Sequence, residues 1–221
     1  MNSRIRSLLI VMLLSTFIVG CSVAPKNSSD TVIEPSESKT TEGGTSDAKL
    51  EAIAKSPAKP EAVYDIDAVA AFEQANSLRD MPDKALALYQ EAIAIDSTME
   101  PAWFNMARMH YDAQDEDNLK RVITEATDKG AVSARMINLL GNLKRQQGLF
   151  TEAATYYDQA LAINENHLSS LANKAIIIDI YQHDPAAALP WYEKYQTQLA
   201  AQGKDDPRVK NWIADLKQRL R

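Results

Sequence analysis

A regular spacing of apolar residues is the feature that most restricts the fold of this sequence. Large apolar residues recur every 34 positions, at Val69, Trp103, Ile137 and Leu171. Small residues follow four positions later in three copies, at Ala107, Gly141 and Ala175, and Glu73 stands in the first copy. Within each copy, apolar residues lie three or four positions apart, which is the period of a helix and not of a strand. The spacing therefore predicts an all-α chain built from repeated units.

A second series of residues lies in the other half of each unit. The segment Ala85–Asp96 has the same pattern as Ala153–Asn164, 68 positions later, and 68 is twice 34. The copy between them is degenerate but in register, and a fourth copy follows after 35 positions, at Ala188, Tyr192 and Tyr195. Small residues let two helices approach closely, and large ones fill the space between successive hairpins. Each unit is therefore expected to be a hairpin of two helices.

A 34-residue unit of two helices resembles the tetratricopeptide repeat. The resemblance extends over about 130 residues and implies a solenoid of about four hairpins at residues 63–202. Residues 203–221 are expected to form a capping helix, in which Asp206 is the N-cap and Pro207 the first helical residue. An apolar stripe on this helix would cover the last hairpin, and its members are Val209, Trp212, Ile213, Leu216 and Leu220.

The first twenty residues have the pattern of an export signal. Arg4 and Arg6 give a positive start, and the apolar run that follows is shorter than the roughly 20 residues that span a bilayer. The sequence Ile18–Cys21 resembles the lipobox of bacterial lipoproteins. The resemblance implies cleavage before Cys21 and attachment of acyl chains, such as palmitate, to this cysteine. A stray cysteine after an ordinary secretory signal is the alternative.

The residues after Cys21 bear on location. Ser22 follows the cysteine, where the sorting rule of enteric-type lipoproteins uses Asp to retain a protein in the inner membrane. The resemblance thus implies a lipid anchor on the periplasmic face of the outer membrane of a Gram-negative bacterium. Residues 21–62 are rich in Ser, Thr, Pro, Glu and Lys and have no sustained apolar period, which predicts a disordered tether.

Several kinds of site are not expected in this sequence. A net charge of -6 and a pI near 5.2 argue against nucleic-acid binding, and a single cysteine cannot form an internal disulfide. His110, His167 and His183 fall in different parts of the repeat, which argues against a zinc site. The acidic stretch 112–118 lacks the glycine and the terminal glutamate of a calcium loop. We therefore expect no catalytic residue, no metal and no cofactor.

The resemblance does indicate a binding surface. In tetratricopeptide proteins the first helices of successive hairpins line a concave groove, and the register places seven candidate residues there: Phe104, Arg108, Tyr111, Arg135, Asn138, Asn142 and Arg145. Asparagine can bond both N–H and C=O of a peptide, and arginine can bind a carboxylate through two N–H groups. Arg108, Asn138, Asn142 and Arg145 therefore predict a clamp for an extended or C-terminal peptide. A solvated face that keeps the solenoid in solution is the alternative.

Together these features predict a membrane-anchored periplasmic scaffold that binds a protein or peptide partner. Related lipoproteins of this architecture serve secretin and pilus biogenesis, regulation of cell-wall hydrolases, or TonB/ExbB-like energised systems. A module that binds glycan or peptidoglycan strands is the alternative, and an enzyme of unrecognised type is a remote one.

Overall fold

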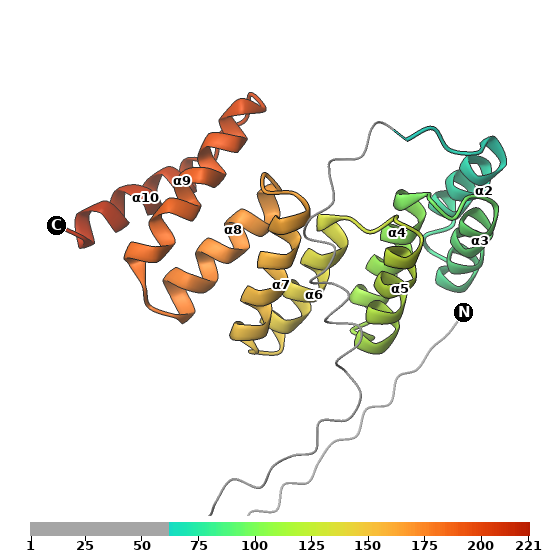
Figure 1. Ribbon diagram of the computed structural model, residues 1–221, viewed down its shortest axis with the longest axis horizontal. Coiled ribbons are helices and arrows are strands. Elements are labelled where there is room, and N and C mark those ends of the chain that lie inside the picture. The colour runs from blue at the N-terminus through green and yellow to red at the C-terminus, as the bar shows by residue number, and fades with distance from the viewer. Residues whose placement is uncertain (1–61) are drawn as a thin grey trace, which may run out of the picture. The chain divides into compact units, whose positions relative to one another are not determined.

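Residues 62–221 are described by the computed structural model, and this part of the chain consists of helices and short connections without a strand (Figure 1). The all-α prediction is confirmed. The predicted signal peptide, Cys21 and the tether up to residue 61 lie outside the described residues. Within the described range, no helix has both the length and the apolar character needed to cross a membrane.

Within residues 62–221, four helical hairpins follow one another (Figure 1). The helices are α2 (Ile66–Ser77) and α3 (Pro82–Ile95), α4 (Glu100–Asp112) and α5 (Glu116–Asp128), α6 (Ala134–Gln146) and α7 (Phe150–Ile163), then α8 (Leu168–Ile176) and α9 (Pro185–Ala201). A π-helical turn, η2 (Ile177–Tyr181), extends α8, and α10 (Pro207–Arg219) packs on α9. Each helix pair packs on the next, as a solenoid requires.

Local sequence signals set where many of these helices begin and end. Asp65, Asp115, Asp184 and Asp206 each accept a backbone N–H of the first turn of α2, α5, α9 and α10. Each aspartate thereby satisfies a donor that has no partner within the helix. Gly148, with φ of 78°, makes the tight turn between α6 and α7, where a residue with a side chain would be strained.

The core contains the residues that carry the 34-residue spacing. Trp103, Ile137 and Leu171 are buried, and so are Tyr89 and Tyr157 of the second series. Gly141 shows why the small position must be small: a Cβ on this residue would lie 2.5 Å from the ring of Tyr157. The packing roles predicted from the sequence therefore hold in the structure.

The π-helical turn accounts for the one irregular spacing in the sequence. Tyr192 follows Tyr157 after 35 positions, one more than the period, and η2 lies between them. A π-helical turn holds one extra residue within a helix. We attribute the extra residue of the fourth unit to this turn, because the flanking helices α8 and α9 keep their hairpin packing.

The capping helix is present, but only part of its stripe is buried. Val209, Ile213 and Leu216 pack into the core formed with Tyr192 and Ala188. Trp212 and Leu220, which the stripe also contains, remain 42% and 44% exposed. Trp212 directly precedes Ile213 and is therefore rotated away from the buried line of the helix. Leu220 is the C-cap and lies beyond the last helical turn, so it differs from the expectation for a separate reason.

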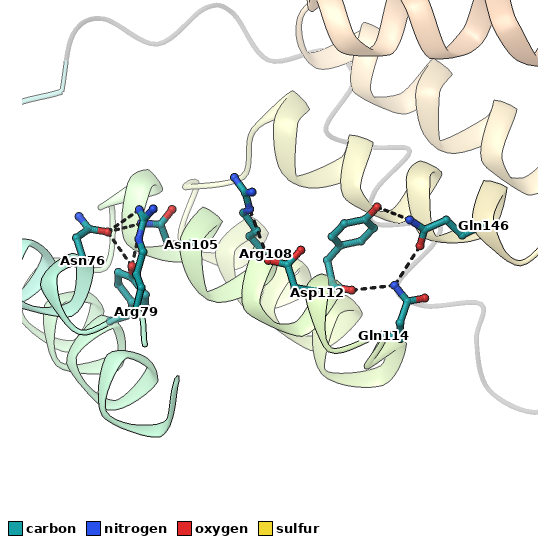
Figure 2. Close-up of polar contacts among 9 residues, drawn as sticks. Asn76, Arg79, Asn105, Arg108, Asp112, Gln114 and Gln146 are labelled. Atoms are coloured by element: carbon teal, nitrogen blue, oxygen red, sulfur yellow. Dashed lines mark hydrogen bonds and ion pairs between the residues drawn. The ribbon is translucent and has the colours of Figure 1, made fainter. Parts of the chain in front are cut away.

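A cluster of tyrosine and asparagine side chains occurs at the first and third junctions between hairpins and is replaced by apolar residues at the second. At the junction of hairpins 1 and 2, Asn76 Oδ1 accepts hydrogen bonds from Tyr89 and Asn105, as Figure 2 shows in part. At the junction of hairpins 3 and 4, Asn142 Oδ1 accepts from Tyr157 and Asn173. At the intervening junction, Ile123 takes the place of the tyrosines, 34 positions from each of them. Leu139 likewise takes the place of Asn105 and Asn173, and both apolar residues are buried. The hydrogen-bonded arrangement thus occurs at the first and third junctions but not at the second.

Candidate peptide-binding groove

A cavity of about 340 Å³ lies between the first helices of hairpins 3 and 4. Asn138, Asn142 and Arg145 line it from α6, and Ser169 and Ala172 line it from α8. All five occupy groove positions of the repeat, and three of them are predicted clamp residues. The structure therefore brings the C-terminal part of the predicted groove together. We call this cavity the α6–α8 cavity.

Arg145 is the one residue of the α6–α8 cavity whose charge is not matched within it. Its Nε atom is buried and has no hydrogen-bond partner among the residues that the structure describes. The guanidinium lies close to the Tyr157 hydroxyl. Burial raises the pKa of Tyr157 to about 12, and the nearby Arg145 charge opposes that rise. A guanidinium in a cavity whose described lining residues include no carboxylate favours an anionic or carbonyl ligand.

The two asparagines present only one side of their amide to the cavity. Asn138 Oδ1 accepts hydrogen bonds from Ser170 and Asn173, each at 3.1 Å. Asn142 Oδ1 accepts from Tyr157 at 3.0 Å and from Asn173 at 2.9 Å. These bonds use the acceptor oxygens to join α6, α7 and α8. The Nδ2 groups remain as donors, so the two-sided contact expected of each asparagine is reduced to a one-sided one.

Arg108 lines a different cavity from the other three residues of the predicted clamp. A cavity of about 350 Å³ between α3 and α4 is lined by Arg79, Asn105, Arg108 and Asp112. Arg108 Nε is 3.7 Å from the carboxylate of Asp112, and both side chains are largely exposed (Figure 2). The register places Arg108 correctly on α4, but it cannot show that a carboxylate one turn later is the partner of Arg108.

Tyr111 contributes to a bridge between α4 and α6. Gln146 Nε2 donates to the Tyr111 hydroxyl at 2.8 Å, and Gln114 Nε2 donates to Gln146 Oε1 at 3.0 Å (Figure 2). The bridge ties hairpins 2 and 3 together at the ends of their first helices. It also engages the Tyr111 hydroxyl, which was a candidate ligand contact.

Phe104 and Arg135 hold the same two hairpins together at the opposite end of α6. The Arg135 guanidinium lies 3.9 Å from the centre of the Phe104 ring, and its Nε donates to Glu100 at 2.7 Å. Ser133 also donates to Glu100. Arg135 lines a third cavity, of about 600 Å³, with Glu100 and His167. Two predicted groove residues are therefore engaged in contacts between hairpins: Arg135 lies over the ring of Phe104 and pairs with Glu100.

His167 and Ser170 come nearest to a catalytic pair in the described part of the chain. His167 Nδ1 lies 2.8 Å from Ser170 Oγ. Burial and the nearby charge of Arg135 lower the pKa of His167. Ser170 is fully buried and donates to Asn138, so its hydroxyl has no path to a substrate. No three His, Cys, Asp or Glu side chains of the described residues are grouped as metal ligands.

Sequence reasoning missed two residues at the heart of these contacts. Asn105 and Asn173 each reach back from a first helix to the tyrosine or asparagine of the preceding hairpin. They stand 68 positions apart in the sequence, like Tyr89 and Tyr157. The shared spacing of 68 positions could have identified the two asparagines. The 34-residue period does not identify them, because Leu139 occupies the corresponding position between them.

Comparison with known families addresses the repeat itself. Residues 134–167, which comprise hairpin 3 and the turn after it, match the family model of the tetratricopeptide repeat. The chain contains a tetratricopeptide repeat. A search of curated protein sequences found no match.

Solved structures show a similar arrangement of helices. The structure of pilF from Pseudomonas aeruginosa is similar over 79% of this chain and 71% of that chain, with 17% identity and a TM-score of 0.50. The MamA protein is similar over 68% of this chain and 81% of that chain, with 14% identity and a TM-score of 0.51. YrrB, described as a TPR protein with an unusual peptide-binding site, gives 16% identity, coverage of 68% and 87%, and a TM-score of 0.44. The fold is that of a tetratricopeptide solenoid.

Proposed function

We propose that the chain is a membrane-anchored scaffold that binds an extended peptide segment of a protein partner in the α6–α8 cavity. The observation that carries this proposal is the lining of the cavity, in which Arg145 is the only charged side chain among the described residues and has no carboxylate beside it. A carboxylate or a carbonyl oxygen of a ligand would supply an acceptor for the part of the guanidinium that faces the cavity.

The chemistry of the cavity fits a peptide better than it fits a cation or an apolar ligand. The cavity is lined by hydrogen-bond donors, which are Arg145, the Nδ2 groups of Asn138 and Asn142, and the Ser169 hydroxyl. Backbone carbonyls and carboxylates accept such bonds, and an extended peptide presents carbonyls at regular intervals. Asn173 and Tyr157 fix the asparagines in place, so little ordering is needed on binding.

The binding test compares two arginine variants of the full chain. A panel of extended synthetic peptides, each with a free or an amidated C-terminus, is screened by fluorescence anisotropy against wild type, Arg145→Ala and Arg121→Ala. Arg121 lies on α5 in an exposed ion pair with Glu125, so its loss removes the same charge away from the cavity. We expect Arg145→Ala to weaken binding about tenfold or more, corresponding to roughly 1 to 3 kcal/mol, and Arg121→Ala to have little effect.

Two results would count against peptide binding in this cavity. One is equal loss of binding in both arginine variants, which would show a non-specific charge effect. The other is unchanged binding in Arg145→Ala, which would place the peptide elsewhere on the chain. Higher salt should weaken the wild-type complex if the guanidinium contact contributes.

Anchoring to the outer membrane is the second part of the proposal, and it is supported by Ile18–Cys21 and Ser22. Three acyl chains on Cys21 would hold the protein far longer than one, since each buried CH₂ contributes about 0.8 kcal/mol. We expect Cys21→Ser to abolish labelling by radioactive palmitate and to remove the protein from the outer-membrane fraction. A wild-type protein that takes up no label would contradict the anchor. Cross-linking of the anchored protein in cells would then decide which of the three envelope systems supplies the partner.

A further inference from the structure

A further cavity lies at the C-terminal end of the solenoid, between groove positions of the fourth hairpin and the capping helix. Its volume is about 420 Å³, and it lies between η2, α9 and α10. Ile176 and Ile180 line it from the α8–η2 helix, Tyr192 from α9 and Trp212 from α10. We call it the C-terminal cavity. It shares no residue with the α6–α8 cavity.

The apolar walls of the C-terminal cavity are more exposed than the fold requires. Ile180 is 53% and Trp212 is 42% exposed, whereas the cap is held in place by Val209, Ile213 and Leu216. The rings of Tyr192 and Trp212 lie 5.7 Å apart at an angle of 56°. A tryptophan at the mouth of a preformed cavity is typical of the anchor points of protein interfaces.

The charges of the C-terminal cavity are unbalanced. Asp179 on η2 is almost fully buried, with 8% of its side chain exposed, and Asp215 is on the exposed face of α10. Arg219 lies 3.2 Å from Asp179 and 3.0 Å from Asp215. One arginine thus serves two carboxylates. The lining residues carry a net charge of about -1.

These features select one class of ligand. Arg219 balances only one of the two carboxylates, so an anion would meet a net negative charge. A cation can approach Asp215, which is 63% exposed, and the partly exposed ring of Trp212. An apolar group attached to the cation would fill the space beside Ile176, Ile180 and Tyr192. A second copy of this chain, paired symmetrically, would bring the same acidic cavity against itself, which like charges disfavour.

We propose that the C-terminal cavity binds a partner segment in which a lysine or arginine stands beside a bulky apolar residue. The π-helical turn carries both Asp179 and Ile180, so the extra residue of the fourth unit builds two parts of this site. The proposal is independent of peptide binding in the α6–α8 cavity, because the two sites have opposite charge preferences.

The test uses two small probes of the same shape and opposite charge. Phenethylammonium carries a cation beside a phenyl ring, and phenylacetate carries an anion. The three tryptophan indole N–H signals of the ¹⁵N-labelled full chain report where each probe binds. Trp103 is buried and donates to Ser97, and Trp191 lies under Lys174, so both serve as internal controls.

We expect phenethylammonium to shift the Trp212 signal at a concentration at least five times lower than phenylacetate. Asp215→Asn should remove most of that difference, and Asp205→Asn should leave it unchanged. Asp205 is an acid of similar exposure that pairs with Lys210 outside the cavity. Ile180→Ala should weaken both probes equally.

The proposal fails if phenylacetate shifts Trp212 as readily as phenethylammonium, because the cavity would then be merely apolar. It fails equally if neither probe shifts Trp212, or if Asp215→Asn keeps the preference for the cation. Arg145→Ala serves as a cross-check, since a change in the Trp212 titration of that variant would show that the two cavities are not separate sites.

Discussion

Gly141 is small because the ring of Tyr157 occupies the space that a side chain would need. The sequence predicted this, since small residues recur at the same position of the repeat. It could not predict that the glycine faces a tyrosine that also donates to Asn142. The repeat spacing indicates what size of residue fits at position 141. It does not indicate the packing partner, which is a side chain of the following helix.

Gly141→Ala is expected to destabilise the fold. Alanine is favoured over glycine in a helix by about 1 kcal/mol, but a Cβ at 2.5 Å from a fully buried ring forces repacking that costs roughly 1 to 3 kcal/mol. We expect a net loss in the free energy of unfolding, measured in urea. In a Tyr157→Ala background the same substitution should no longer destabilise, and a penalty that persists there would show that the ring is not its cause.

A buried ion pair between hairpins escaped the sequence analysis. Lys144 on α6 is almost fully buried, and its Nζ lies 2.7 Å from Glu116 of α5 and 3.3 Å from Glu152 of α7. Burial alone would raise the pKa of Glu116, but hydrogen bonds from Lys144, Gln147 and Lys120 outweigh it and lower the pKa to about 2. From the sequence alone, a lysine is expected at the surface. Only the folded structure shows the two carboxylates that pair with Lys144.

The lowered pKa of Glu116 predicts how stability depends on pH. The folded state binds this proton more weakly than the unfolded state, whose pKa is about 4.5. The stabilisation is therefore complete above pH 4.5 and is lost as the pH falls towards 2, by about 3 kcal/mol for this group. In urea titrations, Glu116→Gln should be less stable at pH 7 and less dependent on pH between 4.5 and 2.

Glu125→Gln is the matched control, because it changes an exposed carboxylate on the same helix. If wild type and Glu116→Gln lose stability in parallel as the pH falls, Glu116 is not the group responsible.

At the scale of whole elements, the sequence predicts the hairpins well and the contacts at their ends poorly. Buried positions repeat with the period of the sequence, so the helices and their order could be read from the pattern. Arg135 was expected in the groove, but it is stacked on Phe104 and paired with Glu100 of the preceding hairpin. Long charged side chains reach partners on either side of a helix, and the repeat register does not decide between them.

Removal of α10 tests the cap. A chain truncated before Gly203 would lose the burial of Val209, Ile213 and Leu216 and would expose Tyr192 and Ala188 beneath them. Each large apolar side chain contributes about 1.5 to 3 kcal/mol when buried, so we expect a loss of several kcal/mol, a lower Tm and new self-association in sedimentation experiments. Removal of Leu220 and Arg221 alone should change little. An unchanged Tm after the longer truncation would mean that α10 does not cap the solenoid.

For the solenoid as a whole, the resemblance predicted one groove, and the predicted residues line several cavities between successive hairpins. The bridge of Tyr111, Gln114 and Gln146 lies at the junction of hairpins 2 and 3. Fully buried residues are concentrated there too, and include Leu119, Val122, Ile123, Ile137, Leu140 and Leu143. In a solenoid, stability is a sum over units and the interfaces between neighbours, so the centre should be more stable than the ends.

Hydrogen exchange followed by mass spectrometry can measure this gradient. We expect backbone amides of α5 and α6 to exchange most slowly, and those of α2 and α10 to exchange first. Equal protection of α2 and α6 would instead indicate that the hairpins unfold as one cooperative unit.

The asparagine and tyrosine cluster occurs at the first and third junctions, and Ile123 and Leu139 replace it at the second, which limits how the solenoid can be lengthened. Insertion of one further hairpin at the first or third junction would separate Asn105 or Asn173 from the residues of the preceding hairpin that accept its hydrogen bonds. Insertion of two hairpins would reproduce both kinds of junction. This solenoid is therefore expected to tolerate lengthening by two hairpins at a time better than lengthening by one.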